Sequence, residues 1–285
     1  MDARKSNAAT ASTRSAEVNG VRYVYRELGP ERPSDPTPIV FLQRFRGTLD
    51  DWDPAFVDEL AKTRHVILFS DAGVGSSTGS AATDVDRKSR NAAEFVRSLG
   101  HDAVDVLGFS MGGFVAQAIA LTEPTLVRKV VLVGTGPGGN PENEPPTDIV
   151  GKIATSPTYA FEDIRYLFFA VGREKETRAS IDRIASRTQD REPVVGADVM
   201  GAMRQVTADF MNGKTGHFGL LKNLRQPVFI VSGDRDPFFP AKNQWLLYRT
   251  LPNAQLAVYP NAGHAPHHQH PVEVAAQIEY FLATP

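Results

Sequence analysis

The sequence predicts an α/β fold with a mostly parallel central sheet and helices on both of its faces. Short apolar runs alternate with amphipathic helical stretches along most of the 285 residues. Strands that are repeatedly followed by helices pair in parallel, because each helical crossover returns the chain to the same end of the sheet. A content of 41% hydrophobic residues is enough to bury one large core of this kind.

The expected elements follow in order along the chain. An alternating segment, 18–28, contains the turn pair Asn19-Gly20 and predicts a hairpin that adds antiparallel strands at one edge. Apolar runs predict further strands at 39–43, 65–70, 103–108, 129–134, 227–232 and 255–259. Helical periodicity between or after these runs predicts helices near 54–63, 85–99, 111–122, 241–251 and 271–283.

The alternation of strands and helices is interrupted over residues 137–215. A linker rich in glycine, proline and acidic residues opens this segment, and helical periodicity without a strand run follows. We therefore expect a helical lid inserted between two core strands, with the core formed by residues 17–136 and 216–285. Residues 1–16 are small, polar and mildly basic, so they are expected to form a disordered tail.

Composition narrows the possible partners and locations. The chain has no cysteine, which excludes disulfides and thiolate metal sites. A formal charge of −2 does not indicate the clustered basic face that nucleic acids require. A secretory signal and an apolar stretch of ~18 residues are both lacking, so we expect a cytoplasmic protein with neither membrane nor nucleic-acid partners. The sequence does not indicate an oligomeric state.

The strongest local signal is a serine in a predicted strand-to-helix turn. Gly108-Phe109-Ser110-Met111-Gly112 follows the pattern Gly-Xaa-Ser-Xaa-Gly, with an apolar strand before it and an alanine-rich helix after it. The two outer glycines lack the Cβ atoms that would collide in so tight a turn. The helix N-terminus also places amide groups beside the serine, where they favour negative charge. This turn therefore predicts a nucleophile.

A serine nucleophile needs a base, and the base needs an orienting acid, because the serine hydroxyl stays protonated at neutral pH. Two acids, Asp234 and Asp236, follow the strand at 227–232, and His264 follows the strand at 255–259. The chain order serine, acid, histidine is the one expected when the nucleophile sits in this kind of turn. The residues alone leave both acids as candidates.

With these motifs the chain resembles the α/β-hydrolase fold superfamily, in its serine esterase and cofactor-free perhydrolase-like branch. The resemblance covers nearly all of residues 18–283. It implies that Asp236 rather than Asp234 is the acid, and that His264, in the pair Gly263-His264, is the base. It also implies that a carboxylic ester of small or medium size, or a lactone, is cleaved through an acyl-enzyme without a cofactor.

The histidines that crowd after the expected base do not predict a metal site. His267, His268 and His270 have no acid cluster and no cysteine at ligand spacing. We expect them to cap or precede the last helix, near the rim of the site.

The loop after the strand at 39–43 departs from the family pattern. An acyl-transfer serine enzyme needs two amide donors for the oxyanion, and Met111 is expected to supply one. By the resemblance, the second is the backbone N–H of Phe45. Arg44 stands where the family usually has a glycine, and Arg46 follows closely. Each arginine is either a solvated or ion-paired rim residue or a ligand for a substrate carboxylate, whose shape suits a guanidinium.

A second departure lies at residues 71–77. This loop resembles a family turn but lacks the arginine that normally braces the neighbouring loops. Arg44 or Arg46 could supply that brace, which favours a structural duty for the two arginines.

Several side chains near these elements are candidates for contact with the substrate. For the aromatic members of the set, an ordinary core position is the alternative. The candidates are Arg44, Arg46, Phe109, Phe161, Tyr166, Phe169 and Phe238.

Two other functions stay open on the sequence alone. A cofactor-free perhydrolase, which forms a peracid from a carboxylic acid and peroxide, would use the same three residues. A non-catalytic ligand-binding protein on this fold would keep the pocket without turnover. Serine at position 110 argues against dehalogenase and epoxide hydrolase chemistry, which in related proteins uses a carboxylate nucleophile.

Overall fold

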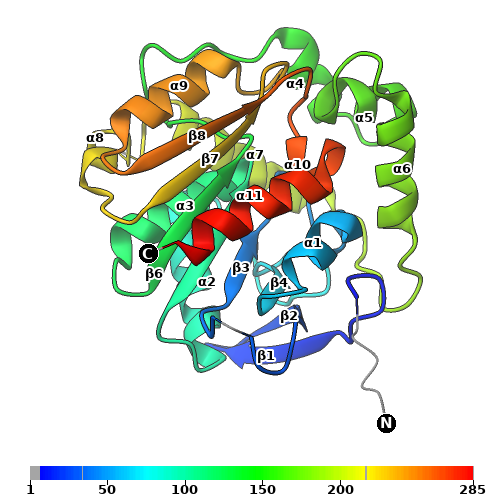
Figure 1. The fold of residues 1–285 in the computed structure, drawn as a ribbon, viewed down its shortest axis with the longest axis vertical. Helices are drawn as coiled ribbons and strands as arrows, with labels where there is room; N and C mark the ends of the chain where they lie inside the picture. Colours follow the sequence, from blue (N-terminus) through cyan, green and yellow to red (C-terminus); the bar gives the residue numbers. More distant parts are fainter. Residues whose placement is uncertain (1–6, 34, 216, 285) are drawn as a thin grey trace.

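One eight-stranded sheet forms the centre of the computed structural model, which describes residues 7–33, 35–215 and 217–284 (Figure 1). From β3 onward the strands run parallel, whereas β1 and β2 are antiparallel additions at one edge. Their order across the sheet is β1-β2-β4-β3-β5-β6-β7-β8, so the predicted fold class is confirmed. The strands are β1 (Arg14–Val18), β2 (Val21–Leu28), β3 (Ile39–Leu42), β4 (Val66–Ser70), β5 (Val104–Phe109), β6 (Val127–Val133), β7 (Val228–Gly233) and β8 (Ala254–Tyr259).

The alternation of side chains along each strand creates two apolar layers, one on each face of the sheet. In β3, Val40 and Leu42 belong to the layer that contains α2 (Val85–Ser98), α3 (Met111–Thr122) and α9 (Ala241–Thr250). Ile39 and Phe41 belong to the opposite layer, with α1 (Pro54–Leu60) and α11 (Pro271–Ala283), which lie side by side in Figure 1. Shorter helical turns are η1 (Leu49–Asp51), α8 (His217–Leu220), η2 (Leu221–Asn223) and α10 (Pro266–Gln269).

The N-terminal tail is shorter than predicted. β1 begins at Arg14 and pairs with β2, although a disordered tail was expected as far as residue 16. Ala8 and Ala11 are buried, and Arg187 donates a hydrogen bond of 3.0 Å to the carbonyl oxygen of Ala11. The polar sequence of this segment does not reveal that a distant guanidinium and a neighbouring strand supply its hydrogen-bond partners. Residues 1–6 of the predicted tail lie outside the described residues.

Between β6 and β7 the described chain forms helices and loops, without a strand. The helices are α4 (Asp148–Ala154), α5 (Phe161–Phe168), α6 (Glu174–Ala185) and α7 (Ala197–Met211). Figure 1 shows α5 and α6 at one side of the sheet. The division of the chain into core and lid segments stays a prediction. Within the described residues no helix combines the length and apolar character needed to cross a membrane.

Buried charges tie this inserted segment to the core. Asp50 forms an ion pair with Arg26, and neither side chain is more than 5% exposed. The other carboxylate oxygen of Asp50 accepts the backbone N–H of Glu192 at 2.6 Å. Asp53 accepts two hydrogen bonds, both of 2.7 Å, from the guanidinium of Arg183 on α6. Because an unpaired buried charge is costly, the contacts of Asp50 with Glu192 and of Asp53 with Arg183 favour the observed position of the insert.

Replacing Asp50 by alanine tests this anchoring. The change leaves Arg26 buried without its partner, so we expect the free energy of unfolding to fall by about 3–5 kcal/mol. Arg14→Ala is the control: Arg14 pairs with Glu27 but is 60% exposed, and exposed pairs contribute about 0–1 kcal/mol. Urea unfolding followed by circular dichroism measures both variants. Equal losses in the two would contradict the anchoring role.

Candidate active site

The turn between β5 and α3 holds Ser110 in a strained conformation. β5 ends at Phe109 and α3 begins at Met111, so a single residue makes the transition. Ser110 has φ 55° and ψ −117°, a region that residues with a side chain rarely adopt. A Cβ atom on Gly112 would collide with the carbonyl oxygen of Leu42 at the end of β3. The glycine therefore allows the helix to start close against the sheet.

Asp236 and His264 form a buried hydrogen-bonded pair in the loops that follow β7 and β8. Asp236 Oδ2 lies 2.9 Å from His264 Nδ1, and neither side chain is more than 2% exposed. Since a carboxylate only accepts hydrogen bonds, Nδ1 carries the proton and Nε2 is left as the basic nitrogen. Asp236 Oδ1 accepts the N–H groups of Phe238 (2.8 Å) and Phe239 (3.0 Å), which fix the carboxylate.

The neighbouring acid, Asp234, has a different contact. Its Oδ1 accepts the backbone N–H of Ala262 at 3.2 Å, which joins the loops after β7 and β8. This contact supports the turn rather than the histidine ring. Of the two acids, Asp236 is thus the one hydrogen-bonded to His264, and its role as the orienting acid stays a prediction.

Aromatic rings enclose the imidazole of His264. The ring centroids of Phe238 and Phe109 lie 4.5 and 4.9 Å from that of His264. The Ser110 side chain makes no hydrogen bond to the helix that it precedes. We predict that the Ser110 hydroxyl donates a hydrogen bond to His264 Nε2 in the substrate complex, because such contacts tighten when substrate binds.

The loop after β3 reaches the cavity that the candidate nucleophile lines. Phe45 and Met111 both line that cavity. The N–H of Phe45 donates no hydrogen bond to the described backbone, and the N–H of Met111, first in α3, has no acceptor within the helix. Gln43 holds the loop: its side chain accepts the N–H of Arg44 and donates to the carbonyl of Thr48, both at 2.8 Å.

Arg44 and Arg46, predicted as candidate substrate ligands, do not line this cavity. Arg44 pairs with Asp51 at 3.1 Å and lies over the ring of Phe168, 5.0 Å from its centroid. Arg46, with a positive φ of 63°, donates to the carbonyl oxygen of Pro157, beyond the end of α4, at 2.9 Å. Both guanidinium groups are therefore engaged with the protein, which corresponds to the structural alternative in the sequence prediction.

An acid rather than an arginine braces the loop at residues 71–77. Glu192, from the inserted segment, accepts the backbone N–H of Ser76 at 2.6 Å. The expectation that Arg44 or Arg46 fills the place of the missing arginine is thus corrected. A carboxylate suits the position because the loop offers N–H donors, which a guanidinium cannot bind.

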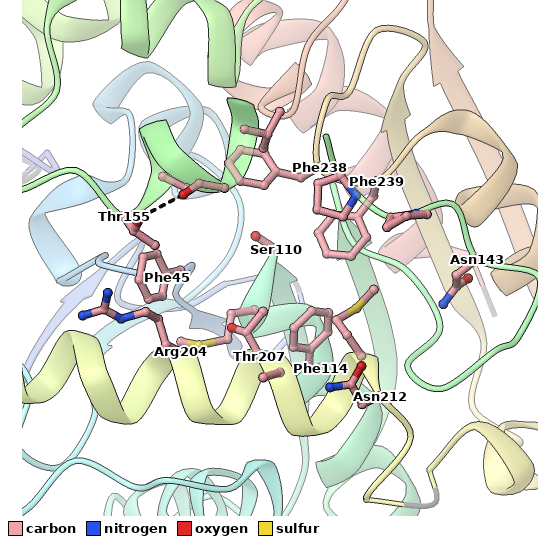
Figure 2. A pocket seen from close by; sticks show the side chains of 18 of the residues that line it. Phe45, Ser110, Phe114, Asn143, Thr155, Arg204, Thr207, Asn212, Phe238 and Phe239 are labelled. Atoms are coloured by element: carbon pink, nitrogen blue, oxygen red, sulfur yellow. Dashed lines mark hydrogen bonds between the residues drawn. The ribbon is translucent and has the colours of Figure 1, made fainter. Parts of the chain in front are cut away.

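Ser110 lies on the wall of a largely apolar cavity of about 650 Å³ (Figure 2). α3, α4 and α7 contribute to its wall, together with the loops after β3 and β7. A cavity of this size accommodates small-molecule ligands. Its aromatic and methionine residues are Phe45, Met111, Phe114, Met211, Phe238 and Phe239.

Among the aromatic candidates for substrate contact, Phe238 lines this cavity and the other four do not. Phe109 is only 1% exposed, because it packs in the core beneath the imidazole. Phe169 lines a separate cavity of about 240 Å³. Phe161 stacks against an arginine of α6, and Tyr166 is 38% exposed. α5, which carries Phe161 and Tyr166, packs with the α1–α11 layer through Leu167 and Phe168, and neither Phe161 nor Tyr166 lines the cavity.

Sequence reasoning missed the contribution of α7. Arg204, Thr207, Ala208 and Met211 all line the cavity from this helix. Their spacing of three, four and seven residues places them on one helical face, which the sequence could have revealed. Tertiary packing determines whether that face of α7 points to the cavity, and the local sequence pattern does not encode it.

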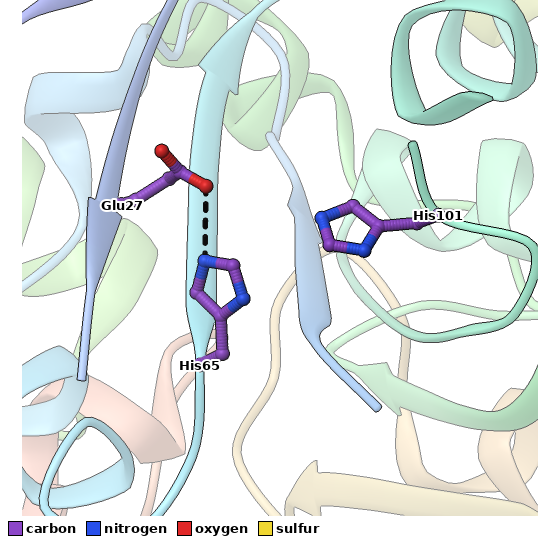
Figure 3. Close-up of side chains that lie close together, drawn as sticks. All are labelled: Glu27, His65 and His101. Carbon is purple, nitrogen blue, oxygen red and sulfur yellow. Dashed lines mark hydrogen bonds and ion pairs between the residues drawn. The ribbon is translucent and has the colours of Figure 1, made fainter. Parts of the chain in front are cut away.

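One cluster outside the cavity has side chains of types that metals accept. The donor atoms of Glu27, His65 and His101 all lie within 4.8 Å of one another (Figure 3). His65 Nε2 is hydrogen-bonded to Glu27 at 3.0 Å, and Glu27 is also paired with Arg14, so the carboxylate is satisfied by protein partners. The group lies near the N-terminal ends of β4 and β5. Ser110 follows the C-terminal end of β5, so the two sites lie at opposite ends of the parallel strands.

Comparison with known proteins places the fold in a wider context. A family model described as the alpha/beta hydrolase fold matches residues 37–271. The solved structure of an alpha/beta hydrolase fold protein from Chitinophaga pinensis is 32% identical, with a TM-score of 0.85, and the match covers 98% of this chain and 100% of that one.

Two curated relatives carry names of different reactions. A pimeloyl-[acyl-carrier protein] methyl ester esterase from Aromatoleum aromaticum is 31% identical over 62% of this chain and 73% of its own. A Bacillus subtilis protein, provisionally named a 2-succinyl-6-hydroxy-2,4-cyclohexadiene-1-carboxylate synthase, is 25% identical over 93% of this chain and 96% of its own. The family is therefore established, whereas the names of relatives differ in the reaction.

Two buried histidines lie just after the candidate base. His267 and His268 belong to α10, directly before the last helix, as predicted, but both are buried rather than at a rim. The ring of His267 packs against Phe109, 4.4 Å between centroids. Burial lowers the pKa of His268 to about 4 and holds the pKa of His267 well below its ordinary value. Both rings are therefore neutral at pH 7.

Acid should destabilise the fold through these two histidines. An unfolded histidine titrates near pH 6.5, whereas folded His268 titrates near pH 4. Between these values the unfolded chain binds more protons, so the free energy of unfolding falls as the pH drops, by up to about 1.4 kcal/mol per pH unit per histidine. Urea unfolding across this range measures the slope. An unchanged slope in His268→Asn would contradict the assignment to His268.

Proposed function

We propose that this chain, which belongs to the alpha/beta hydrolase fold family, hydrolyses small or medium carboxylic esters, or lactones, through an acyl-enzyme on Ser110. The observation that carries the proposal is the strained position of Ser110 on the wall of an apolar cavity. The buried Asp236–His264 pair supports it, since it supplies an oriented base. Serine as the nucleophile favours acyl transfer over reactions that need a carboxylate in its place.

In the first half of the proposed cycle, Ser110 Oγ forms a bond to the ester carbonyl carbon while His264 Nε2 takes the hydroxyl proton. Asp236 stabilises the resulting imidazolium through Nδ1. The carbonyl oxygen becomes an oxyanion that accepts hydrogen bonds from the N–H groups of Met111 and Phe45. One such donor contributes about 3–4 kcal/mol to lowering the barrier in comparable sites.

The intermediate then breaks the bond between carbonyl carbon and leaving oxygen, and the imidazolium gives its proton to that oxygen. The alcohol leaves and an acyl-Ser110 ester remains. Water repeats the addition, with its proton taken by His264, and collapse releases the carboxylic acid as Ser110 regains a proton. Each turnover thus consumes one ester and one water and requires no cofactor.

The inserted helices act, in this proposal, as a lid that selects the substrate. α4 and α7 contribute part of the cavity wall, so the size of acyl or alcohol group admitted depends on their position. The esterase name of one relative supports an ester substrate. The synthase name of another shows that names differ within the family, so the proposal depends on the residues of this chain.

Replacing Ser110 by alanine removes the proposed nucleophile. On any ester that the wild type cleaves, we expect kcat/KM to fall by at least ~10³-fold, the scale of losses when a triad member is removed. A panel of esters and lactones of graded chain length provides the substrates, and circular dichroism checks that the variant folds. Equal rates in the two proteins would exclude Ser110 as the nucleophile.

The two acids after β7 offer a matched comparison. Asp236→Asn should lower kcat on the order of 10⁴-fold, because an amide no longer holds the histidine in the required tautomer. Asp234→Asn leaves the hydrogen bond between Asp236 and His264 in place and changes only the contacts of Asp234 with Ala262 and Arg235, so its rate should remain near that of the wild type. Steady-state kinetics on one ester measures kcat for both variants. A larger loss of kcat in Asp234→Asn than in Asp236→Asn would assign the role of orienting acid to Asp234.

A further inference from the structure

The Ser110 cavity has one charged side chain in its lining, Arg204 on α7. The rest of the lining consists of apolar residues, small residues and neutral amides and hydroxyls. A guanidinium at the mouth of so much apolar surface offers an anionic group the one charged partner in the lining, with N–H donors whose planar arrangement suits a carboxylate.

Helical geometry explains why Arg204 is on this side of α7. Met203, Val206 and Phe210 form the buried face of the helix, which packs in the core. Arg204 shares a different face with Thr207, and that face lines the cavity. The arginine therefore extends from the cavity side of α7, although it is exposed enough to lie at the mouth.

The guanidinium of Arg204 has no ion-pair partner in the part of the chain that the structure describes. The acid nearest in sequence on α7, Asp209, pairs instead with Lys214 at 2.6 Å and accepts a hydrogen bond from Gln205. By contrast, Arg44 and Arg183 are each paired with an aspartate. Arg204 thus keeps its five N–H donors available to a ligand.

Figure 2 shows Arg204 at one end of the cavity, with its guanidinium beyond the ring of Phe45 as seen from Ser110. Arg204 lies beside Phe45 and Thr155, and Thr207 lies between it and Phe114. Asn143 and Asn212 lie at the other side of Ser110 in this view. A substrate with its carbonyl at Ser110 would therefore extend one end toward Arg204 and the other toward the two amides.

We propose that the substrate is an ester whose end nearest Phe45 carries a carboxylate, held by Arg204, as in a monoester of a dicarboxylic acid. The proposal rests on the proposed ester hydrolysis at Ser110. A carboxylate fits better than a phosphate, because one guanidinium forms a bidentate pair with one carboxylate and neutralises its single charge. A phosphate dianion would retain a net negative charge against the apolar wall.

Kinetics with charged and neutral esters test the carboxylate. Monomethyl esters of dicarboxylic acids, from succinate to azelate, are compared with methyl alkanoates of matched length. For the preferred length, the ratio of kcat/KM for the charged over the neutral ester should fall at least about tenfold in Arg204→Gln, chiefly through KM, the loss expected for a charge-assisted hydrogen bond. Arg204→Lys should retain part of the ratio, because it keeps the charge without the planar fork.

Arg178→Gln is the matched control, since it removes an exposed arginine of the insert that stacks on Phe161 and does not line the cavity. Its ratio should stay within about twofold of the wild-type ratio. Wild-type preference for neutral esters at every length, or an equal ratio in the two glutamine variants, would overturn the carboxylate proposal while leaving ester hydrolysis intact.

A binding measurement separates failure of this proposal from failure of the proposed function. Calorimetry with the Ser110→Ala protein and a dicarboxylic monoester needs no turnover. Binding that is lost in the double variant Ser110→Ala/Arg204→Gln supports the anion site even where the wild type shows no hydrolysis. Equal binding by the single and double variants would reject Arg204 as the ligand, whatever the rates.

Discussion

The rest of the site depends on one strained residue between a strand and a helix. Ser110 takes a φ of 55°, and a conformation of this kind costs roughly 1–3 kcal/mol unless the surroundings impose it. The surrounding backbone imposes it here, because the segments approach one another closely. A Cβ atom on Gly108 would collide with the carbonyl of Gly112, and a Cβ atom on Gly112 would collide with the end of β3. The same turn makes Met111 the first residue of α3. The strain, the proposed nucleophile and the expected oxyanion donor thus arise from one local feature.

Hydrogen bonds from Arg46 to the segment between β6 and β7 are the second feature that positions the site. The backbone N–H of Arg46 donates to the sulfur of Met203 on α7, and its guanidinium donates to carbonyl oxygens just beyond α4. Phe45, the expected second oxyanion donor, is its neighbour in the chain. A displacement of α4 or α7 would therefore act on the loop that carries Phe45. In the proposed function, substrate selection by these helices and stabilisation of the oxyanion are physically linked.

Local pattern made much of this account predictable from sequence. Apolar runs predicted strands β3 to β8 to within a few residues, and glycine spacing identified the turn at Ser110, whereas most of β1 fell in the predicted tail. The partners of Arg46 and Glu192 could not be predicted, because they come from segments more than a hundred residues away and depend on tertiary approach. Arg204 was missed for the same reason: its helical face could be derived, but the direction of that face is set by how α7 packs.

Intact-protein mass spectrometry after treatment with a fluorophosphonate tests the central claim most directly, because the reagent reacts with an activated serine and needs no knowledge of the substrate. The account predicts one covalent adduct, mapped by peptide analysis to the segment that contains Ser110 and absent from Ser110→Ala. A folded wild-type protein that forms no adduct, or an adduct on another residue, would contradict a nucleophilic Ser110 activated by the Asp236–His264 pair.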